Sequence, residues 1–198
     1  MKTTNTAALI LAAGFSRRFR SDKRTAEYRS GESLLQASVK IWIETAFPVY
    51  LSLSDRADDQ AIADAFAALP LQVLRCAQAH EGMGATIAES IGLLAPAAPK
   101  AIAIALGDMP LLKASTLRAL AERAGEDRIV IPVFNGRRGH PVFFGSCFLG
   151  ALQELEGDRG AAGVLRANAD ACVELPVDDP GIHLDADTPA ELEALRRR

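Results

Sequence analysis

Apolar runs alternate with helical patterns along the whole chain. Short β-type runs lie at 7–13, 49–53, 71–76, 101–106 and 128–134. The first and the fourth are apolar at every position, instead of alternating with polar residues. Continuous runs of this kind are typical of strands covered on both faces, as in a parallel sheet flanked by helices. The pattern therefore predicts central parallel strands.

The segments between these runs repeat apolar residues with helical spacing. Ser33 and Gln36 form a capping box at the start of a helix predicted over Ser33–Thr45. Thr188, followed by Pro189, predicts the start of a last helix. Weaker helical patterns lie at 58–69, 85–94 and 113–124. This alternation predicts the α/β class, a three-layer sandwich whose Rossmann-like, mostly parallel sheet carries helices on both faces.

The chain shows no internal repeat, low-complexity tract or interdomain linker. Its length of 198 residues suits a single domain over 1–198. Two β-type runs around the turn residues Asn135 and Gly136 predict a hairpin-like insertion around 128–145.

Charge narrows the class of function. The formal net charge is −3, so we do not expect general nucleic-acid binding. Against this background, cations gather in one short segment: Arg17, Arg18, Arg20, Lys23 and Arg24. Such a local cluster indicates an anion site. A solvated charged loop is the alternative.

No segment approaches the roughly 20 apolar residues that cross a bilayer. The apolar stretch after Lys2 is short and runs into arginines without a small-residue cleavage site, unlike a secretory signal. The cysteines lie far apart, which argues against a zinc site and against a disulfide framework. We expect a cytoplasmic protein without a membrane or nucleic-acid partner.

Two loops follow the fully apolar strands, at the strand ends where open parallel sheets bind ligands. Gly14 opens the first loop, where a flexible backbone, its amides and the nearby cations can receive phosphate oxygens. Asp108 lies in the second loop. Its carboxylate either caps the following helix or holds a cation, for which Mg²⁺ is a natural candidate.

A second acidic segment precedes the last helix. Asp185 and Asp187 are two residues apart, so they point to the same side of an extended chain. Thr188 already supplies the helix cap. Structural and functional interpretations are equally open, and the functional one requires this segment to pack beside Asp108.

The loop Leu11-Ala12-Ala13-Gly14-x-Ser16-x-Arg18, with Lys23 five residues on, resembles the signature of nucleotidyltransferases that activate small phosphates with NTPs. It is most similar to the molybdenum cofactor cytidylyltransferases and their guanylyltransferase relatives, the molybdopterin nucleotidyltransferase-like family. Further matching motifs follow in the family's order over nearly the whole chain: Glu81–Ile87, Gly107–Pro110, Arg138–Phe144, Gly157–Ala161 and Asp185–Pro189. The chain departs from the family at Phe19-Arg20, where Met-Gly is usual, and at Ala162, where arginine is common.

This resemblance implies a nucleotide-diphospho-sugar transferase-like fold and roles for individual residues. Arg18, Lys23 and Asp108 would be catalytic, the first two on triphosphate oxygens, and Asp108 with Asp187 would bind Mg²⁺. The nucleotide would contact Leu11, Ala12, Ala13, Gly14, Ser16, Arg18, Lys23, Gly82, Gly84 and Thr86. The acceptor would contact Gly139, His140, Asp158 and Gly160, on the side of the 128–145 hairpin. A purely structural turn role for His140 is an equal alternative.

The implied reaction moves CMP from CTP to the terminal phosphate of molybdopterin, with Mg²⁺ as cofactor and pyrophosphate as product. Ala13 resembles the LAAG loop of the cytidylyltransferases rather than the LAGG loop of the guanylyltransferases, which favours CTP over GTP. Guanylyl transfer, or transfer to another small phosphate, is the nearest alternative. A non-catalytic chaperone that hands the cofactor to an apo-molybdoenzyme is the alternative from another class. A dehydrogenase is disfavoured, because the first loop lacks two of the fingerprint glycines.

Overall fold

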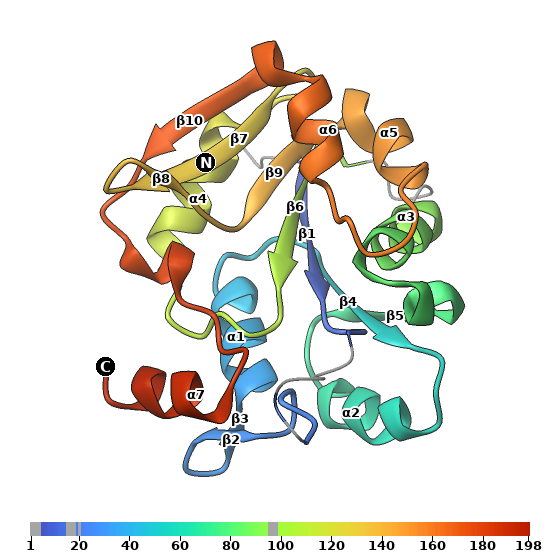
Figure 1. The fold of residues 1–198 in the computed structure, drawn as a ribbon, viewed down its shortest axis with the longest axis vertical. Coiled ribbons are helices and arrows are strands. Elements are labelled where there is room, and N and C mark those ends of the chain that lie inside the picture. The colour runs from blue at the N-terminus through green and yellow to red at the C-terminus, as the bar shows by residue number, and fades with distance from the viewer. Residues whose placement is uncertain (1–4, 15–18, 20, 95–98) are drawn as a thin grey trace.

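The computed structural model describes residues 5–14, 19, 21–94 and 99–198. Its main sheet contains β1 (Thr6–Leu11), β4 (Val49–Ser54), β5 (Gln72–Cys76), β6 (Ala101–Leu106), β7 (Ile129–Phe134), β8 (Arg137–Arg138), β9 (Val142–Gly145) and β10 (Cys172–Pro176). The strand order is β10-β7-β9-β6-β1-β4-β5, with β8 paired to β7 beside this path (Figure 1). β9 runs antiparallel to β6 and β7, and the other neighbours on the path are parallel. The predicted mostly parallel sheet is confirmed.

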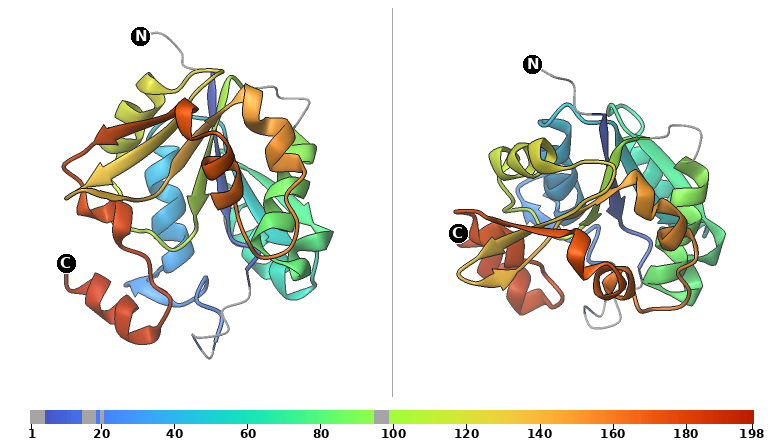
Figure 2. Two further views of the ribbon diagram at one scale, coloured as in Figure 1. Left: turned by 45° about the horizontal axis from the view of Figure 1, so that its top comes forward. Right: turned by 90° about the horizontal axis from the view of Figure 1, so that it is seen from above.

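Helices cover both faces of this sheet (Figure 2). Their bounds are α1 (Leu34–Ile43), α2 (Asp58–Phe66), α3 (Met83–Leu94), α4 (Ala114–Arg123), α5 (Leu149–Gln153), α6 (Ala162–Ala167) and α7 (Pro189–Arg196). Short 3-10 helices are η1 (Ala77–Glu81), η3 (Ser146–Phe148), η4 (Ala169–Ala171) and η5 (Pro180–His183). One core packs α1, α2 and α4 on the sheet, and a second core packs α3, α5 and α6 on its other face. The three-layer sandwich is confirmed.

The two cores explain why the central strands are apolar at every position. On β1, Ala8 and Ile10 belong to the core under α1, whereas Ala7 and Leu9 belong to the core under α3. Successive strand residues point to opposite faces. A strand between two helical layers therefore needs an apolar residue at each position.

Local signals in the sequence set several element ends. At α1, Gln36 N donates to Ser33 Oγ (3.2 Å) and Ser33 N donates to Gln36 Oε1 (2.8 Å), which confirms the capping box. Thr188 caps α7 as predicted, by accepting from the backbone N of Glu191. The strand predicted over 7–13 is shorter, because Ala12 and Ala13 already belong to the following loop.

A small satellite core lies below the main sheet. It joins α7 to the antiparallel hairpin of β2 (Glu27–Arg29) and β3 (Glu32–Ser33). Tyr28, Leu34, Ala186 and Leu192 are among its buried side chains. The hairpin begins at Glu27, shortly after Lys23, and the helix begins at Pro189, shortly after Asp187. This core therefore brings two residues that are far apart in the sequence to one place.

The 128–145 segment forms β7, β8 and β9. Asn135 and Gly136 connect β7 to β8, with φ of 51° and 73°, as a tight two-residue hairpin turn requires. That the whole chain is one domain with an acceptor-side insertion stays a prediction. Among the described helices, none combines the length and the apolar character needed to cross a membrane.

Candidate active site

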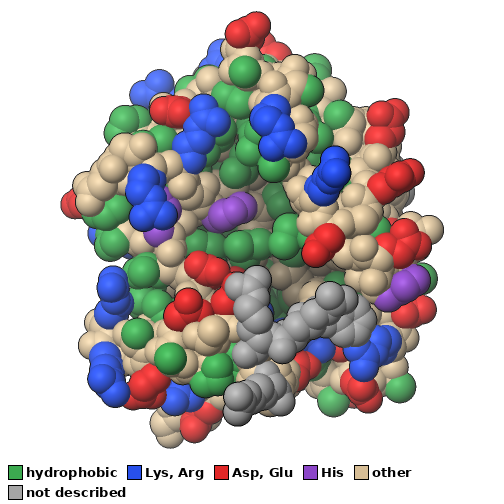
Figure 3. Space-filling view, viewed as in Figure 1, with side chains coloured by type: hydrophobic (Ala, Val, Ile, Leu, Met, Phe, Trp, Pro, Cys, Tyr) green, Lys and Arg blue, Asp and Glu red, His purple; other side chains and the backbone are tan. Residues whose placement is uncertain are grey.

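A pocket of about 920 Å³ opens at the carboxyl ends of β1 and β6. Leu11 pairs with Leu106 in these parallel strands, so the two following loops start side by side, as predicted. The face in Figure 3 is hollowed here, and acidic side chains gather beside the hollow. The pocket is lined by Leu11, Ala12, Ala13, Gly14, Lys23, Arg24, Leu34, Ala79, His80, Glu81, Gly82, Met83, Thr86, Leu106, Gly107, Asp108, Asp158, Asp185 and Asp187.

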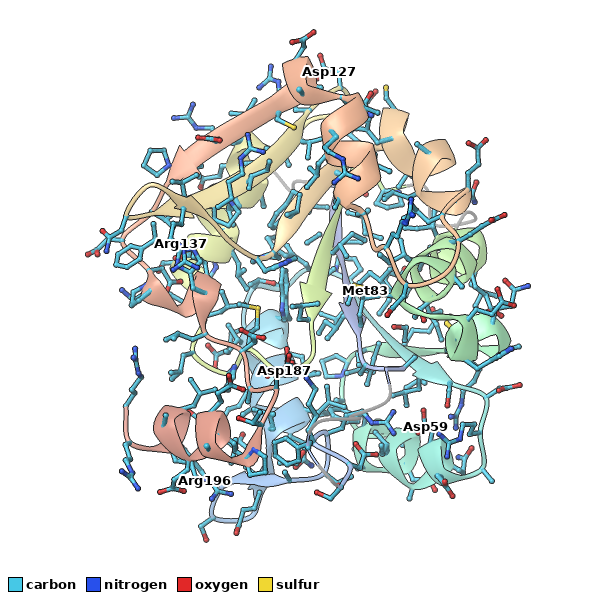
Figure 4. The ribbon with its side chains drawn as sticks, in the orientation of Figure 1. Asp59, Met83, Asp127, Arg137, Asp187 and Arg196 are labelled. Atoms are coloured by element: carbon cyan, nitrogen blue, oxygen red, sulfur yellow. The ribbon has the colours of Figure 1, made fainter. Side chains whose placement is uncertain are left out.

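Three carboxylates that line this pocket lie close together. Asp108, Asp185 and Asp187 each place an oxygen within 4.8 Å of the others. Figure 4 shows Asp187 projecting towards the sheet from the segment before α7. The acidic segment therefore packs beside Asp108, which is the condition for a functional interpretation.

Asp108 is 7% exposed, and its Oδ1 is buried without a hydrogen-bond partner among the described residues. Burial raises the pKa of this carboxyl above 3.8, although the charge of Lys23 opposes the shift. A buried carboxylate oxygen without a partner is costly. Because hard divalent cations take such oxygens as ligands, the donor set fits Mg²⁺ or Mn²⁺.

Lys23 lies between two of these carboxylates. Its Nζ is 2.5 Å from Asp108 Oδ2 and 3.0 Å from Asp187 Oδ1. Burial alone would lower the pKa of this ammonium, but the attraction and hydrogen bonds of both aspartates raise it above 10.5. Lys23 is therefore charged and contacts carboxylates in this structure, whereas its triphosphate role stays a prediction.

The loop after β1 also lines the pocket. Leu11, Ala12, Ala13 and Gly14 all border it, and their contact with a nucleotide stays a prediction. The methyl group of Ala13 packs in a small apolar cluster with two residues before α3, Cys76 and Ala79. The predicted residues Ser16 and Arg18 lie outside the described residues.

The glycines before and within α3 serve close packing. A side chain at Gly82 would come within 2.7 Å of the Gly157 carbonyl, and Gly82 has a φ of 132°. Gly84 N donates to the same carbonyl at 2.7 Å. Gly82 and Thr86 line the pocket, whereas Gly84 faces the 156–157 backbone. Close packing between α3 and this loop is enough to explain both glycines, and no ligand contact is needed to account for them.

Asp158 lines the pocket from the other side of that contact. Its Oδ1 accepts from the backbone N of Met83 at 3.3 Å, so it binds the first turn of α3. Figure 4 shows Met83 at the start of α3. A Cβ on Gly160 would lie 3.1 Å from the sulfur of Met83. Asp158 and Gly160 therefore both contact Met83 at the start of α3, and their acceptor role stays a prediction.

The other predicted acceptor residues lie beside η5. Gly139 N donates to Pro132 O, and a Cβ on Gly139 would come within 2.5 Å of the Ile182 carbonyl. His140 N donates to that carbonyl at 2.9 Å. Desolvation lowers the pKa of His140 below 6.5, and interaction with Asp185 opposes this shift. The electrostatic link to Asp185 connects this segment to the carboxylates.

Some residues of the site carried no distinct signal in the sequence. For Asp185 the only signal is its spacing from Asp187, and the structure places its carboxylate in the cluster with Asp108 and Asp187. Glu81 and Met83 also line the pocket, and their only signal in the sequence is the matching motif Glu81–Ile87, which assigned no role to either of them. Arg24 belongs to the predicted cation cluster, but its guanidinium binds the carboxylates of Asp22 and Asp59.

Known proteins resemble this chain in sequence and in fold. The bifunctional protein GlmU of Paraburkholderia phytofirmans is 34% identical over 119 residues, which are 60% of this chain and 25% of that protein. The chain thus spans about a quarter of that relative's length. The crystal structure of Rv0371c from Mycobacterium tuberculosis H37Rv is 26% identical with a TM-score of 0.86, over 100% of both chains. The Rv0371c structure in complex with manganese is 23% identical with a TM-score of 0.82, over 98% of this chain and 99% of that one, and shows the shared fold.

A family model also covers most of the chain. The model of the MobA-like NTP transferase domain matches residues 8–178, a span that begins within β1, includes the loops after β1 and β6 and the 128–145 hairpin, and ends before Asp185 and Asp187. This agrees with the resemblance carried by the sequence motifs. The chain therefore belongs to the MobA-like NTP transferase domain family and has the nucleotidyltransferase fold.

Proposed function

We propose that this chain is a Mg²⁺-dependent cytidylyltransferase. It would transfer CMP from CTP to the terminal phosphate of a small acceptor of the molybdopterin type and release pyrophosphate. One observation carries the proposal: Lys23 contacts both Asp108 and Asp187 where all three line a pocket at the strand ends of β1 and β6.

Asp108 and Asp187, with Asp185 beside them, would hold the divalent cation. When bound, Mg²⁺ would neutralise charge on the reacting phosphates and fix their geometry. The unpartnered Oδ1 of Asp108 supports this assignment. Rv0371c in complex with manganese, a structure of the same fold, supports a divalent cation in general.

The protein side of the reaction needs little covalent chemistry. Phosphoryl-type transfer depends mainly on alignment of the reactants and on neutralised charge. The backbone around Gly14 borders the pocket beside the carboxylates and would receive the triphosphate. Lys23 has a flexible stem and would turn from the carboxylates to a phosphate oxygen once the nucleotide binds.

The preference for CTP rests on Ala13. Its methyl group is 3% exposed and fills space between the first loop and η1. A methyl group at this position, where the LAGG loop of the guanylyltransferases has glycine, would leave less room for a purine than for cytosine. The acceptor would lie on the side of Gly139 and His140, with its terminal phosphate directed towards Asp185 and the metal.

Pyrophosphate release from each of the four NTPs, with Mg²⁺ and with or without molybdopterin cofactor, tests this function. We expect release that requires CTP, metal and acceptor together. Release with GTP instead of CTP would reverse the nucleotide assignment. No release under any condition, combined with tight binding of the molybdenum cofactor, would favour a carrier that serves an apo-molybdoenzyme.

A further inference from the structure

The guanidinium of Arg24 uses all five of its N–H donors within the protein. Nη1 donates to Ala12 O (2.8 Å) and Asp59 Oδ2 (2.9 Å), and Nη2 donates to Asp59 Oδ1 (2.7 Å) and Asp22 Oδ2 (2.6 Å). Nε donates to Asp22 Oδ1 at 2.8 Å. Because arginine has five donors in a fixed planar arrangement, Arg24 has none left for a phosphate. Its neighbour Lys23 instead faces the metal-site carboxylates.

Asp59 is fixed on its other side as well. Both the backbone N and the Oγ of Ser54 donate to Asp59 Oδ2 at 2.8 Å. The residue is 1% exposed, and Figure 4 shows it on α2. Burial alone would raise the pKa of this carboxyl, but hydrogen bonds from Arg24 and Ser54 hold it below 3.8. The pair is therefore charged and ties the start of α2 to the end of β4.

This network fixes backbone on both sides of the pocket. Ala12 donates its N to Ser52 O (3.1 Å), and its carbonyl accepts from Arg24, so the first residue after β1 is fixed at both polar atoms. The Arg24 carbonyl accepts from Leu35 N at the start of α1. Both the side chain and the backbone of Arg24 are thus anchored. The direction in which the side chain of the preceding residue, Lys23, leaves the backbone depends on this anchor.

We infer that Arg24 and Asp59 are a positioning pair for the nucleotide side of the pocket. They do not contact the nucleotide, but they hold the Ala12 backbone and the origin of the Lys23 side chain in the orientation used for binding. The inference rests on the proposed function, because it concerns residues that we assign to the nucleotide. It also explains a cation in the loop that takes no phosphate.

Equilibrium binding of CTP with Mg²⁺ to the full chain, measured by calorimetry well below the melting temperature, tests this inference. Asp59→Asn places an amide NH₂ against donors of Arg24 and Ser54. Arg24→Lys keeps the charge but has three donors on a flexible stem. We expect each variant to weaken CTP binding by about tenfold or more, because small misplacements of positioning groups have effects of this order. The Arg24→Lys, Asp59→Asn double variant should lose no more affinity for CTP than the weaker-binding single variant, since both changes disrupt the same ion pair.

Matched measurements separate the possible outcomes. If the wild-type chain binds no NTP, the proposed function fails. If the wild type binds CTP and both single variants bind it equally well, the positioning role is overturned, even when their melting temperatures fall. Retained affinity in Arg24→Lys, with loss in an uncharged Arg24→Gln variant, would instead indicate a direct charge effect on phosphate.

A milder variant covers the case in which the buried pair cannot be changed without unfolding. Asp22 has a side chain that is 35% exposed and binds Arg24 alongside Asp59. Asp22→Asn should fold and weaken CTP binding about threefold; unchanged affinity would also overturn the inference. Lys100→Gln and Glu126→Gln break an exposed ion pair away from the pocket, and CTP affinity should not change in either.

Discussion

The two ends of the central sheet differ in how deeply their ion pairs are buried. At the carboxyl ends of the strands, Asp59 and Asp108 are 1% and 7% exposed and are paired with Arg24 and Lys23. At the amino ends of β6 and β7, the ion pairs are on the surface. Lys100 lies 2.9 Å from Glu126, and both side chains are more than half exposed. Figure 4 shows Asp127, from the amino end, at the top of the molecule and Asp187 near its centre.

The difference shows where charge has a purpose other than solubility. Exposed pairs contribute little to stability, whereas buried charges cost free energy unless partners satisfy them. At the carboxyl ends, the carboxylates of Asp108, Asp185 and Asp187 face one another around a pocket, an arrangement that a metal would stabilise. Changes at this end should therefore alter function strongly, and changes at the other end should alter almost nothing.

Asp108→Asn is expected to have the largest effect. The amide keeps the size of the side chain but removes the charge that the metal and Lys23 require. Turnover should fall by about a thousandfold or more, as when a group that stabilises the transition state is lost. Steady-state pyrophosphate release with CTP, Mg²⁺ and acceptor measures this.

The same variant should remain folded. Burial raises the pKa of Asp108, which means that the folded protein disfavours its charged form. Replacing it with a neutral isostere should leave the melting temperature no lower than that of the wild type. Activity that survives in Asp108→Asn would contradict the metal assignment, whereas a lost fold would contradict the electrostatic argument.

Much of the fold could be predicted because its signals are local. The all-apolar runs at β1 and β6 and the capping box at Ser33 depend on neighbouring residues in the sequence. β10 was not predicted, because Cys172–Pro176 is an edge strand whose side chains are largely accessible. The five-residue α5 and the six-residue α6 are too short to show a helical period.

The candidate site could be predicted in its residues but not in its pairings. Asp108 and Lys23 stood out through their positions after buried strands, yet they are 85 residues apart in the sequence. Nothing local reveals that the ammonium lies between Asp108 and Asp187. Asp59 carries no distinguishing signal in the sequence, because an acidic residue at a helix start already has an ordinary explanation. Only the folded backbone shows which charges meet.

Lys23→Met should have the next largest effect. Without the ammonium, the carboxylates of Asp108 and Asp187 lose the cation that lies 2.5 Å and 3.0 Å from them. The free energy of unfolding should fall by about 2 kcal/mol, as when a partly buried charged hydrogen-bond partner is removed. Mn²⁺ or Mg²⁺ should raise the melting temperature more in Lys23→Met than in the wild type, because the ion no longer competes with Lys23.

Thermal unfolding with and without each metal checks the Lys23 prediction. Lys100→Met removes an exposed ammonium from the amino end and is the matched control. An equal metal-dependent increase in Lys23→Met and in the wild type would mean that the ion and Lys23 do not share one position.

The Asp59 carboxylate should give a smaller effect, visible in acid. Its pKa is lowered below 3.8 in the folded protein, so its contribution to stability is present above pH 4 and is lost as the pH falls through the folded-state pKa. Asp59→Asn should therefore be less stable than the wild type at pH 7, and the gap should narrow towards pH 3. Urea unfolding at both pH values measures this, and a constant gap would show that the ion pair is not the cause.

Glu126→Gln should have the smallest effect and completes the comparison from the other end of the sheet. Glu126 Oε1 accepts from Lys100 Nζ at 2.9 Å, but the two side chains are 55% and 66% exposed. Solvent and salt screen such a pair, so the free energy of unfolding should change by about 0.5 kcal/mol or less. The Glu126 backbone carbonyl still accepts from Cys147 N, which holds the loop before β7 in place without the ion pair.

Urea unfolding at low and at high salt should give nearly the same stability for variant and wild type. A loss comparable to that of Lys23→Met would mean that charge supports the sheet equally at both ends, and that the carboxyl ends are not special.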